Sequence, residues 1–263
     1  MYLTLSNEES KQIKFDQFIG ILERGMDILQ SFGKSTPELT IADVAKITGY
    51  SRASCRRILL TYNEIGFIQY DGKHFSLSPK ILTLGFSFLF SQPITEVARP
   101  ILKKINRKLK EGCSLTIYEN GEIVYLVRIE GERVMPATIG IGGRFPAYFT
   151  SMGRVFLSDL STKELDSYFE STTLEKITPK TEVAVSKLRK EIARAKKNGY
   201  AICQDQVEIG HTSLAVPLYN SHNELVAAIN IVTHTWRTPK RKLIDEYLPI
   251  LLESSKEISK FLI

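Results

Sequence analysis

Apolar residues in the first third of the chain recur at helical spacing and predict successive helices. Between residues 17 and 32 they recur every three or four positions, which places them on one face of a helix that Gly33 ends. Thr40 and Asp43 then have the spacing of a capping box, in which each side chain accepts a hydrogen bond from the other residue's backbone. This pair predicts the start of a short helix over residues 41–47.

The third helix follows a glycine, in the arrangement of a helix-turn-helix. Gly49 breaks the second helix, and Ser51 provides a cap for a helix that runs to about residue 65. A helix-turn-helix needs a small residue where its helices touch, a glycine in the turn and two buried positions, and these are Ala45, Gly49, Cys55 and Ile58. We interpret Cys55 as a small buried apolar group rather than a reactive thiol.

The exposed face of the third helix carries positive charge near its start. The expected inward side chains are those of Cys55, Ile58, Leu59 and Tyr62, and the expected outward ones are those of Ser51, Arg52, Arg56 and Arg57. Ser54 is expected to reach a phosphate or a base edge. The start of a recognition helix enters the major groove of DNA, where an arginine pairs with guanine through two hydrogen bonds. The alternative is an exposed basic helix without a partner, but the turn glycine and the caps favour DNA binding.

A hairpin follows directly, which predicts a winged helix-turn-helix. Residues 67–70 and 73–77 have the pattern of two short strands around Asp71-Gly72. The hairpin tip is expected to contact the DNA backbone or the minor groove, and His74 has no partner at the spacing of a metal ligand. The predicted DNA contacts are Thr40, Ser51, Arg52, Ser54, Arg56, Arg57, Lys73 and His74.

Residues 79–90 are apolar almost all round, and Pro93 follows soon after them. A helix of this kind has to be buried on more than one side. Because it connects two parts of the chain, we expect it to pack against the same helix of a second subunit. The expected assembly is a homodimer, or a dimer of dimers, that binds two half-sites on DNA. Packing within its own chain is the alternative.

The rest of the chain mixes strand and helix patterns. Asn120-Gly121 between two β-rich runs is a strong hairpin signal, and Gly199 ends a helix. The expected strands are residues 113–118, 123–128, 134–139, 213–219 and 225–233, and the expected helices are residues 97–109, 150–157, 163–169, 183–198 and 239–263. A mostly antiparallel sheet flanked by helices is typical of a small-molecule sensor, and the expected fold class is α+β in two domains.

Composition narrows the class of protein. The chain has 263 residues, 43% of them hydrophobic and 24% charged, which suits two folded domains and excludes a disordered or fibrous chain. Its longest nearly apolar run, residues 81–90, is about half of the ~20 residues that a membrane span needs. No secretory signal opens the chain, and its three scattered cysteines give neither a disulfide framework nor metal spacing. We therefore expect the protein to be located in a reducing cytoplasm.

The net charge of +6 is informative mainly through its location. Residues 46–80 hold six basic side chains against Glu64 and Asp71, which places positive charge on the predicted helix-turn-helix. Two further basic runs, residues 99–110 and 187–197, contain apolar residues at helical spacing. We interpret both of them as solvated helix faces.

Two groups of residues suggest catalysis, and neither is specific. Gly140 to Gly143 resembles a phosphate-binding loop, but no Gly-Lys-Ser/Thr follows, which favours a turn. Cys203, His211 and Ser213 include a nucleophile and a base, but the flanking sequence does not support that role. We predict that the protein is not an enzyme and uses no cofactor or metal.

Several segments resemble the IclR-type transcriptional regulators. In the C-terminal half these are TSMGRVFL, NGYAICQDQVEIGHTSLAVPLY and LVAAINIV. In the N-terminal half, ERGMDILQSFG, SRASCRRILLTYNEIGFI and DGKHFSLSPKILTLGFSFL are most similar to the β-ketoadipate branch, whose members respond to aromatic acids such as protocatechuate or 4-hydroxybenzoate. The resemblance covers about residues 17–260.

The resemblance implies a GAF-like domain whose effector pocket lies inside a curved sheet. Ser151 and Met152 match the start of a helix whose backbone amides meet an effector carboxylate, a role that suits helix N-termini. The other matched pocket positions are Cys203, Ser213 and Asn230. The branch usually reads Gly-Leu-Arg-Ser where this chain has Gly-His-Thr-Ser, so we expect His211 to replace the missing arginine in part. A structural hydrogen bond is the alternative for each polar side chain.

The expected organisation is an N-terminal tail (1–16), a winged helix-turn-helix (17–78), a linker helix (79–95) and an effector-binding domain (96–263). The expected function is that of a cytoplasmic DNA-binding transcriptional regulator, a repressor or an activator, controlled by a small aromatic or keto acid. The alternatives are a ligand-free architectural DNA-binding protein and a metabolic enzyme that uses Cys203 and His211.

Overall fold

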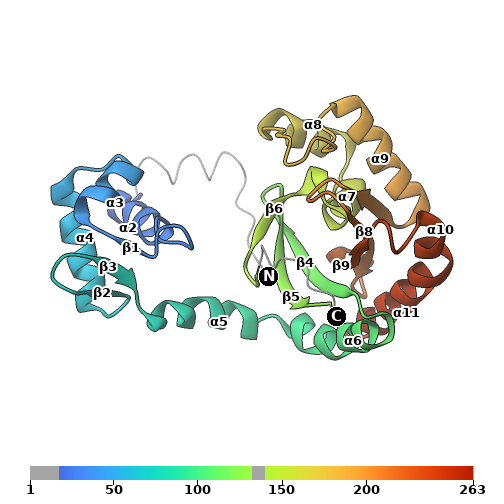
Figure 1. Ribbon diagram of the computed structural model, residues 1–263, viewed down its shortest axis with the longest axis horizontal. Coiled ribbons are helices and arrows are strands. Elements are labelled where there is room, and N and C mark those ends of the chain that lie inside the picture. The colour runs from blue at the N-terminus through green and yellow to red at the C-terminus, as the bar shows by residue number, and fades with distance from the viewer. Residues whose placement is uncertain (1–17, 132–139, 263) are drawn as a thin grey trace. The chain divides into compact units, whose positions relative to one another are not determined.

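The computed structural model describes residues 18–131 and 140–262, and the chain forms two compact units that divide between Phe88 and Leu89 (Figure 1). The predicted N-terminal tail and the strand predicted at residues 134–139 lie outside the described residues. Each unit has its own hydrophobic core. The two units are therefore described one after the other.

The first unit packs helices against a small antiparallel sheet. Its helices are α2 (Gly20–Gln30), α3 (Ile41–Thr48) and α4 (Arg52–Glu64), and its strands are β1 (Glu38–Leu39), β2 (Ile68–Tyr70) and β3 (Phe75–Leu77). The strands lie in the order β1-β3-β2. Ile28, Val44, Cys55, Leu59 and Phe75 are buried together in the core.

Both ends of α3 have the predicted local structure, a capping box at its start and a glycine in the turn to α4. The Thr40 backbone N–H donates to the Asp43 carboxylate at 2.9 Å, and the Asp43 backbone N–H donates to the Thr40 hydroxyl at 3.3 Å, so the capping box is confirmed. Gly49 has φ 74°, a left-handed conformation that glycine adopts without strain. Helix α2 is shorter than the helix predicted for residues 17–32. It begins at Gly20, after Ile19, whose side chain makes no capping hydrogen bond, and it ends at Gln30.

The linker begins with a short 3₁₀ turn (Pro79–Ile81) and continues as α5 (Leu82–Phe90). No residue of α5 is buried, and the exposed large apolar side chains are Leu82, Leu84, Phe86, Phe88 and Phe90. Among the described residues, no single helix is long and apolar enough to cross a membrane. Residues 79–90 and 93–109 pass that test only as a pair, bent by 86°.

The second unit is built on one antiparallel sheet of six strands, in the order β6-β5-β4-β9-β8-β7. The strands are β4 (Gly112–Glu119), β5 (Glu122–Ile129), β6 (Arg144–Pro146), β7 (Ala201–Gln204), β8 (His211–Tyr219) and β9 (Leu225–His234). The helices are α6 (Pro93–Leu109), α7 (Ser151–Asp159), α8 (Thr162–Ser171), α9 (Val185–Asn198), α10 (Lys240–Lys242) and α11 (Leu248–Ser259), with a 3₁₀ turn at Ala147–Phe149 and a π turn at Leu243–Tyr247.

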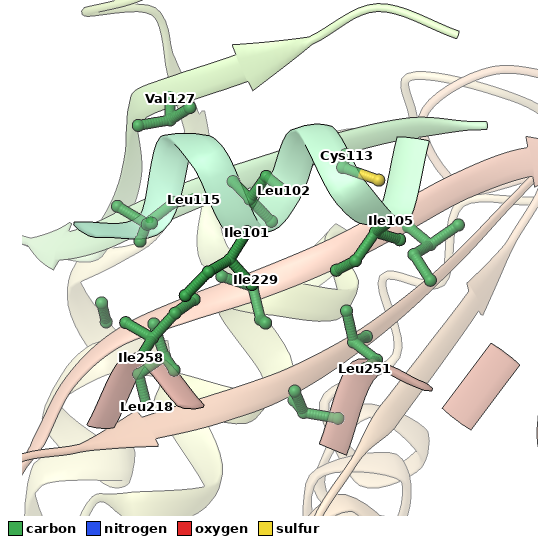
Figure 2. Close-up of a cluster of buried hydrophobic side chains, with 14 of the residues drawn as sticks. Ile101, Leu102, Ile105, Cys113, Leu115, Val127, Leu218, Ile229, Leu251 and Ile258 are labelled. Atoms are coloured by element: carbon green, nitrogen blue, oxygen red, sulfur yellow. The ribbon is translucent and has the colours of Figure 1, made fainter. Parts of the chain in front are cut away.

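Both faces of this sheet are covered. Figure 2 shows Ile101, Leu102 and Ile105 of α6 with Leu251 and Ile258 of α11 packed against one face. On the other face, strand side chains such as Ile123, Ala215 and Ala228 pack against α7 through its residues Met152, Val155 and Phe156. Polar side chains on the α7 face are therefore also shielded from water.

Three features of the second unit differ from the sequence prediction. Strands β6 and β7 were not predicted, because short edge strands carry too few residues to show alternation. Helix α6 begins at Pro93, before the predicted position 97. The single helix predicted for residues 239–263 is interrupted by the π turn, because Pro249 has no N–H and its ring crowds the preceding turn.

The first turn of α7 requires a glycine. A Cβ atom on Gly153 would lie 2.1 Å from the Ala147 carbonyl oxygen and 2.4 Å from its Cα atom. Both atoms are backbone and belong to the 3₁₀ turn that precedes α7, so neither moves aside as a side chain does. The glycine thus sets how closely α7 approaches this turn.

We predict that Gly153→Ala lowers the free energy of unfolding by about 3 kcal/mol, because the added methyl group forces α7 away from the 3₁₀ turn. In thermal unfolding this corresponds to a decrease in Tm of about 6–12 °C. Gly140→Ala is the matched control, since its Cβ meets no atom within 4 Å and its change is expected within about 0.5 kcal/mol. Equal Tm values for the two variants would contradict this packing argument.

Candidate functional site

Helix α4 places its basic side chains toward solvent. Cys55, Ile58 and Leu59 are buried, whereas the side chains on the opposite face, Arg52, Arg56 and Arg57, are exposed. The Ser51 hydroxyl caps the helix by accepting a hydrogen bond from the Ser54 backbone N–H at 3.2 Å. The predicted inward and outward positions of these residues are confirmed, whereas Ser54 and Tyr62 are half-buried.

The hairpin tip is held by one carboxylate. Asp71 accepts hydrogen bonds from the backbone N–H groups of Lys73 (2.8 Å) and His74 (2.7 Å), which lowers the pKa of this carboxyl group. Lys73 is exposed, and the His74 imidazole lies 3.5 Å from the Asp71 carboxylate. Thr40 differs from the other predicted contacts, because its hydroxyl donates to Asp43 at 2.6 Å within the capping box.

A cavity of about 160 Å³ lies in the second unit, between the sheet and the start of α7. Its walls come from β4, β5, β7, β8 and β9 and from residues 150–152. The structure brings all of the predicted pocket positions to this cavity, namely Ser151, Met152, Cys203, His211, Ser213 and Asn230.

Three of these side chains form a hydrogen-bonded chain. The Ser151 and Ser213 hydroxyl oxygens lie 2.5 Å apart, and the Asn230 amide nitrogen donates to Ser213 at 3.1 Å. Asn230 is only 2% exposed, and its Oδ1 atom has no hydrogen-bond partner among the described residues. A buried acceptor without a donor costs free energy, so this atom is suited to accept a hydrogen bond from a guest molecule.

Arg128 is a cavity residue that the sequence did not reveal. It lies near the end of β5, and its buried Nε atom has no hydrogen-bond partner within the described ranges. Ser114 pairs with Arg128 on one side and with Asn230 on the other, so these residues form one row across the sheet. Adjacent strands are about 4.8 Å apart, which separates the Arg128 and Asn230 backbones by about 10 Å.

The cavity thus has an unpaired donor and an unpaired acceptor on one wall, and the α7 N-terminus on another. Thr150 caps α7 by accepting from the Gly153 N–H at 2.9 Å, and the helix direction brings partial positive charge to the cavity. A small molecule with a negatively charged group and a hydroxyl group meets both requirements.

The possible catalytic trio is not arranged as an activated nucleophile. Cys203 is buried, and burial raises the pKa of its thiol. The His211 Nδ1 atom lies 3.2 Å from the Glu208 carboxylate. Ser213 is engaged in the chain with Ser151 and Asn230. A nucleophilic cysteine needs a lowered pKa, the opposite of what this environment produces.

Two family models match the chain. The IclR helix-turn-helix domain matches residues 21–72, and the C-terminal domain of bacterial IclR transcriptional regulators matches residues 86–260. The first match contains α3 and α4, and the second contains the cavity.

Curated relatives match over nearly their full lengths. The Pca regulon regulatory protein of Pseudomonas putida is 34% identical over 242 residues, covering 92% of this chain and 83% of the relative. The p-hydroxybenzoate hydroxylase transcriptional activator of Acinetobacter baylyi is 29% identical, covering 95% and 94%.

Solved structures of transcriptional regulators also superpose on this chain. A transcriptional regulator from Rhodococcus superposes with a TM-score of 0.82 at 35% identity, covering 93% of this chain and 98% of that one. A double mutant of the PobR inducer-binding domain from Acinetobacter, in complex with 3-hydroxybenzoic acid, superposes with a TM-score of 0.60 at 26% identity, covering 64% and 98%.

We predict that Cys55, Cys113 and Cys203 react slowly with Ellman's reagent near pH 8 in the folded protein, because all are buried and burial raises the pKa of Cys113 and Cys203. All three thiols should titrate in guanidinium chloride. Rapid labelling of one native thiol that disappears in Cys203→Ser would contradict the prediction and favour a reactive cysteine in the cavity.

Proposed function

The chain belongs to the IclR family of bacterial transcriptional regulators, in its β-ketoadipate branch, and from this premise we propose that a small hydroxylated aromatic acid in the cavity controls its binding to operator DNA. The observation that carries the proposal is the buried cavity with its unpaired Arg128 donor and unpaired Asn230 acceptor. The bound 3-hydroxybenzoic acid of the PobR domain supports the same class of ligand.

The DNA reader is α4. Arg52, Arg56 and Arg57 project from a helix whose opposite face is fixed in the core, so they are free to enter a major groove. Lys73 and His74 at the hairpin tip would add contacts to phosphates, which strengthen binding at low salt without reading sequence. We assign Thr40, Ser51 and Ser54 to backbone contacts near the start of the two helices.

We further propose a homodimer. The α5 side chains Leu82 and Leu84 and the α2 side chains Ile21, Leu22 and Met26 are exposed in the single chain. Large apolar surface of this kind is usually covered by another protein surface. Two copies related by a two-fold axis would present two α4 helices to half-sites about 34–36 Å apart.

In the cavity, the carboxylate of the effector would accept from Arg128 and approach the backbone amides of Ser151 and Met152 at the start of α7. Its hydroxyl group would donate to Asn230 Oδ1, which lies two strands away from Arg128. Arg128 therefore supplies the cation that the Gly-His-Thr-Ser segment lacks.

Control of DNA binding requires that the effector contact two states of the dimer differently. We expect a coupling free energy of about 1–3 kcal/mol between the effector and DNA.

We also propose that the protein acts in the cytoplasm and catalyses no reaction, in agreement with its free cysteines and the raised pKa of Cys203.

Arg56→Ala is expected to weaken binding to the DNA upstream of the protein's own gene by about 5- to 150-fold, because a bidentate contact to guanine contributes about 1–3 kcal/mol. Fluorescence anisotropy with this DNA and with random DNA of equal length measures both affinities. Lys190→Ala, on the exposed face of α9, is the control and should change neither. An equal loss for both DNAs in Arg56→Ala would contradict base reading by Arg56.

Arg128→Ala is expected to weaken the binding of 4-hydroxybenzoate by about 10- to 100-fold, because it removes a charge-assisted hydrogen bond in a buried site. Titration calorimetry with 4-hydroxybenzoate and with uncharged 4-hydroxybenzyl alcohol separates charge recognition from packing. The alcohol should bind the wild type and the variant alike. An equal loss of affinity for both molecules would indicate a structural role for Arg128 instead.

A further inference from the structure

His211 stands at one end of the cavity wall with a second histidine directly opposite. Its side chain is 13% exposed and lines the cavity at the start of β8. His234 is its cross-strand partner on β9, and the two ring centroids are 5.1 Å apart with the planes at 64°. Like charges on directly opposed residues repel, so the facing imidazole disfavours protonation of His211.

The ring contacts continue from His234 to the surface. His234 stacks on Trp236 with centroids 5.9 Å apart, and Trp236 is 76% exposed beneath the Arg237 guanidinium group. Trp236 is the single tryptophan of the chain. An imidazole in the cavity is therefore connected through one ring to a fluorescent side chain at the surface.

The groups around His211 act in opposite directions on its protonation. Burial and the facing His234 lower the pKa of His211, while the carboxylates of Glu208 and Asp205 raise it, and the pKa is lowered on balance. Other titratable groups that line the same cavity are Arg128, Glu130, Tyr125, Cys113 and Cys203. In the empty cavity His211 is therefore mostly neutral near pH 7.

We propose that His211 is a specificity-determining residue of this cavity, which takes up a proton from solvent when an anion binds, and that His234 controls how readily it does so. The proposal rests on the proposed function, because it concerns the same anionic effector. The bound negative charge lies in the same cavity as the imidazole, so its electric field favours the protonated form of His211 and offsets the repulsion from His234.

The direction of the pH dependence follows from linkage. The bound anion raises the pKa of His211 above its value in the empty cavity, so binding is accompanied by proton uptake between these two values. Affinity for the anion must then increase as pH falls through this range. The carboxyl group of the effector remains ionised there, since carboxyl groups titrate near pH 4.

The experiment uses the full-length chain and 4-hydroxybenzoate as the probe, followed by Trp236 fluorescence and by calorimetry in buffers of different ionisation enthalpy. The wild type is expected to bind about three- to tenfold more tightly at about pH 6 than at about pH 7.5, with uptake of up to one proton. His211→Gln should remove this dependence. His222→Gln, in the exposed loop between β8 and β9, should retain it.

His234→Gln tests the role of the second ring. Without the facing imidazole, His211 protonates more easily, so the rise in affinity should begin at higher pH than in the wild type. In the wild type, NMR of ¹³C-labelled histidine follows the imidazole of His211 among the four histidines of the chain. Its titration midpoint should move to higher pH when 4-hydroxybenzoate is added, which a purely structural histidine would not show.

Binding of 4-hydroxybenzoate with an affinity that is constant between about pH 6 and pH 7.5 would overturn the role of His211 and leave the proposed function intact. The same pH dependence in His211→Gln and in the wild type would also overturn it, provided that both have the same Tm. Binding of no hydroxybenzoate at any pH would contradict the proposed function itself, and the inference with it.

Discussion

A row of polar side chains lies buried on one face of the central sheet, and the cavity takes its properties from this arrangement. Ser114, Arg128 and Asn230 occupy paired positions on three adjacent strands, while the residues that alternate with them pack against α6 and α11. Because both faces are covered, bulk water does not satisfy every polar atom in the row. The unpaired Arg128 and Asn230 atoms therefore destabilise the empty domain, and a molecule that pairs with both regains that free energy on binding.

The close packing of α7 is the second condition for the cavity. Gly153 allows the helix to approach the 3₁₀ turn at Ala147, and this approach brings Ser151 to hydrogen-bonding distance of Ser213. A larger residue at position 153 would move the α7 N-terminus and separate the two hydroxyl groups. The packing of a helix and the polarity of a ligand site are in this way determined by the same few residues.

The sequence predicted the first unit well because its signals are local. A capping box, a left-handed glycine and a helical repeat act within a few residues of one another, and Thr40, Gly49 and Ser51 have the expected geometry. The cavity depends instead on pairings between distant strands. Its predicted residues were found through a resemblance to a family, whereas Arg128 follows the apolar run of β5 and is aligned with the cavity only by strand pairing and a bulge in β5.

Hydrogen bonds connect the cavity wall to the helix that follows the linker. The Asn106 side chain, in the last turns of α6, donates to the carbonyl oxygens of Glu111 and Glu130 at 2.8 Å each, and Glu130 lines the cavity. The buried Glu111 carboxylate in turn accepts from Arg237 and Thr233, which joins the end of α6 to the end of β9.

This network is a physical connection, but a connection alone does not produce regulation. Regulation requires two arrangements that the effector distinguishes by its contacts. The proton uptake proposed for His211 would meet this requirement, because the charge of the cavity wall would then depend on its occupant, and His211 lies on a strand of the sheet that α6 covers. A change in charge at the wall alters the electrostatic free energy of the strands to which α6 is bound, and α6 is continuous in sequence with the linker helix α5. On this proposal, the effector would act on the chain segment that leads to α4.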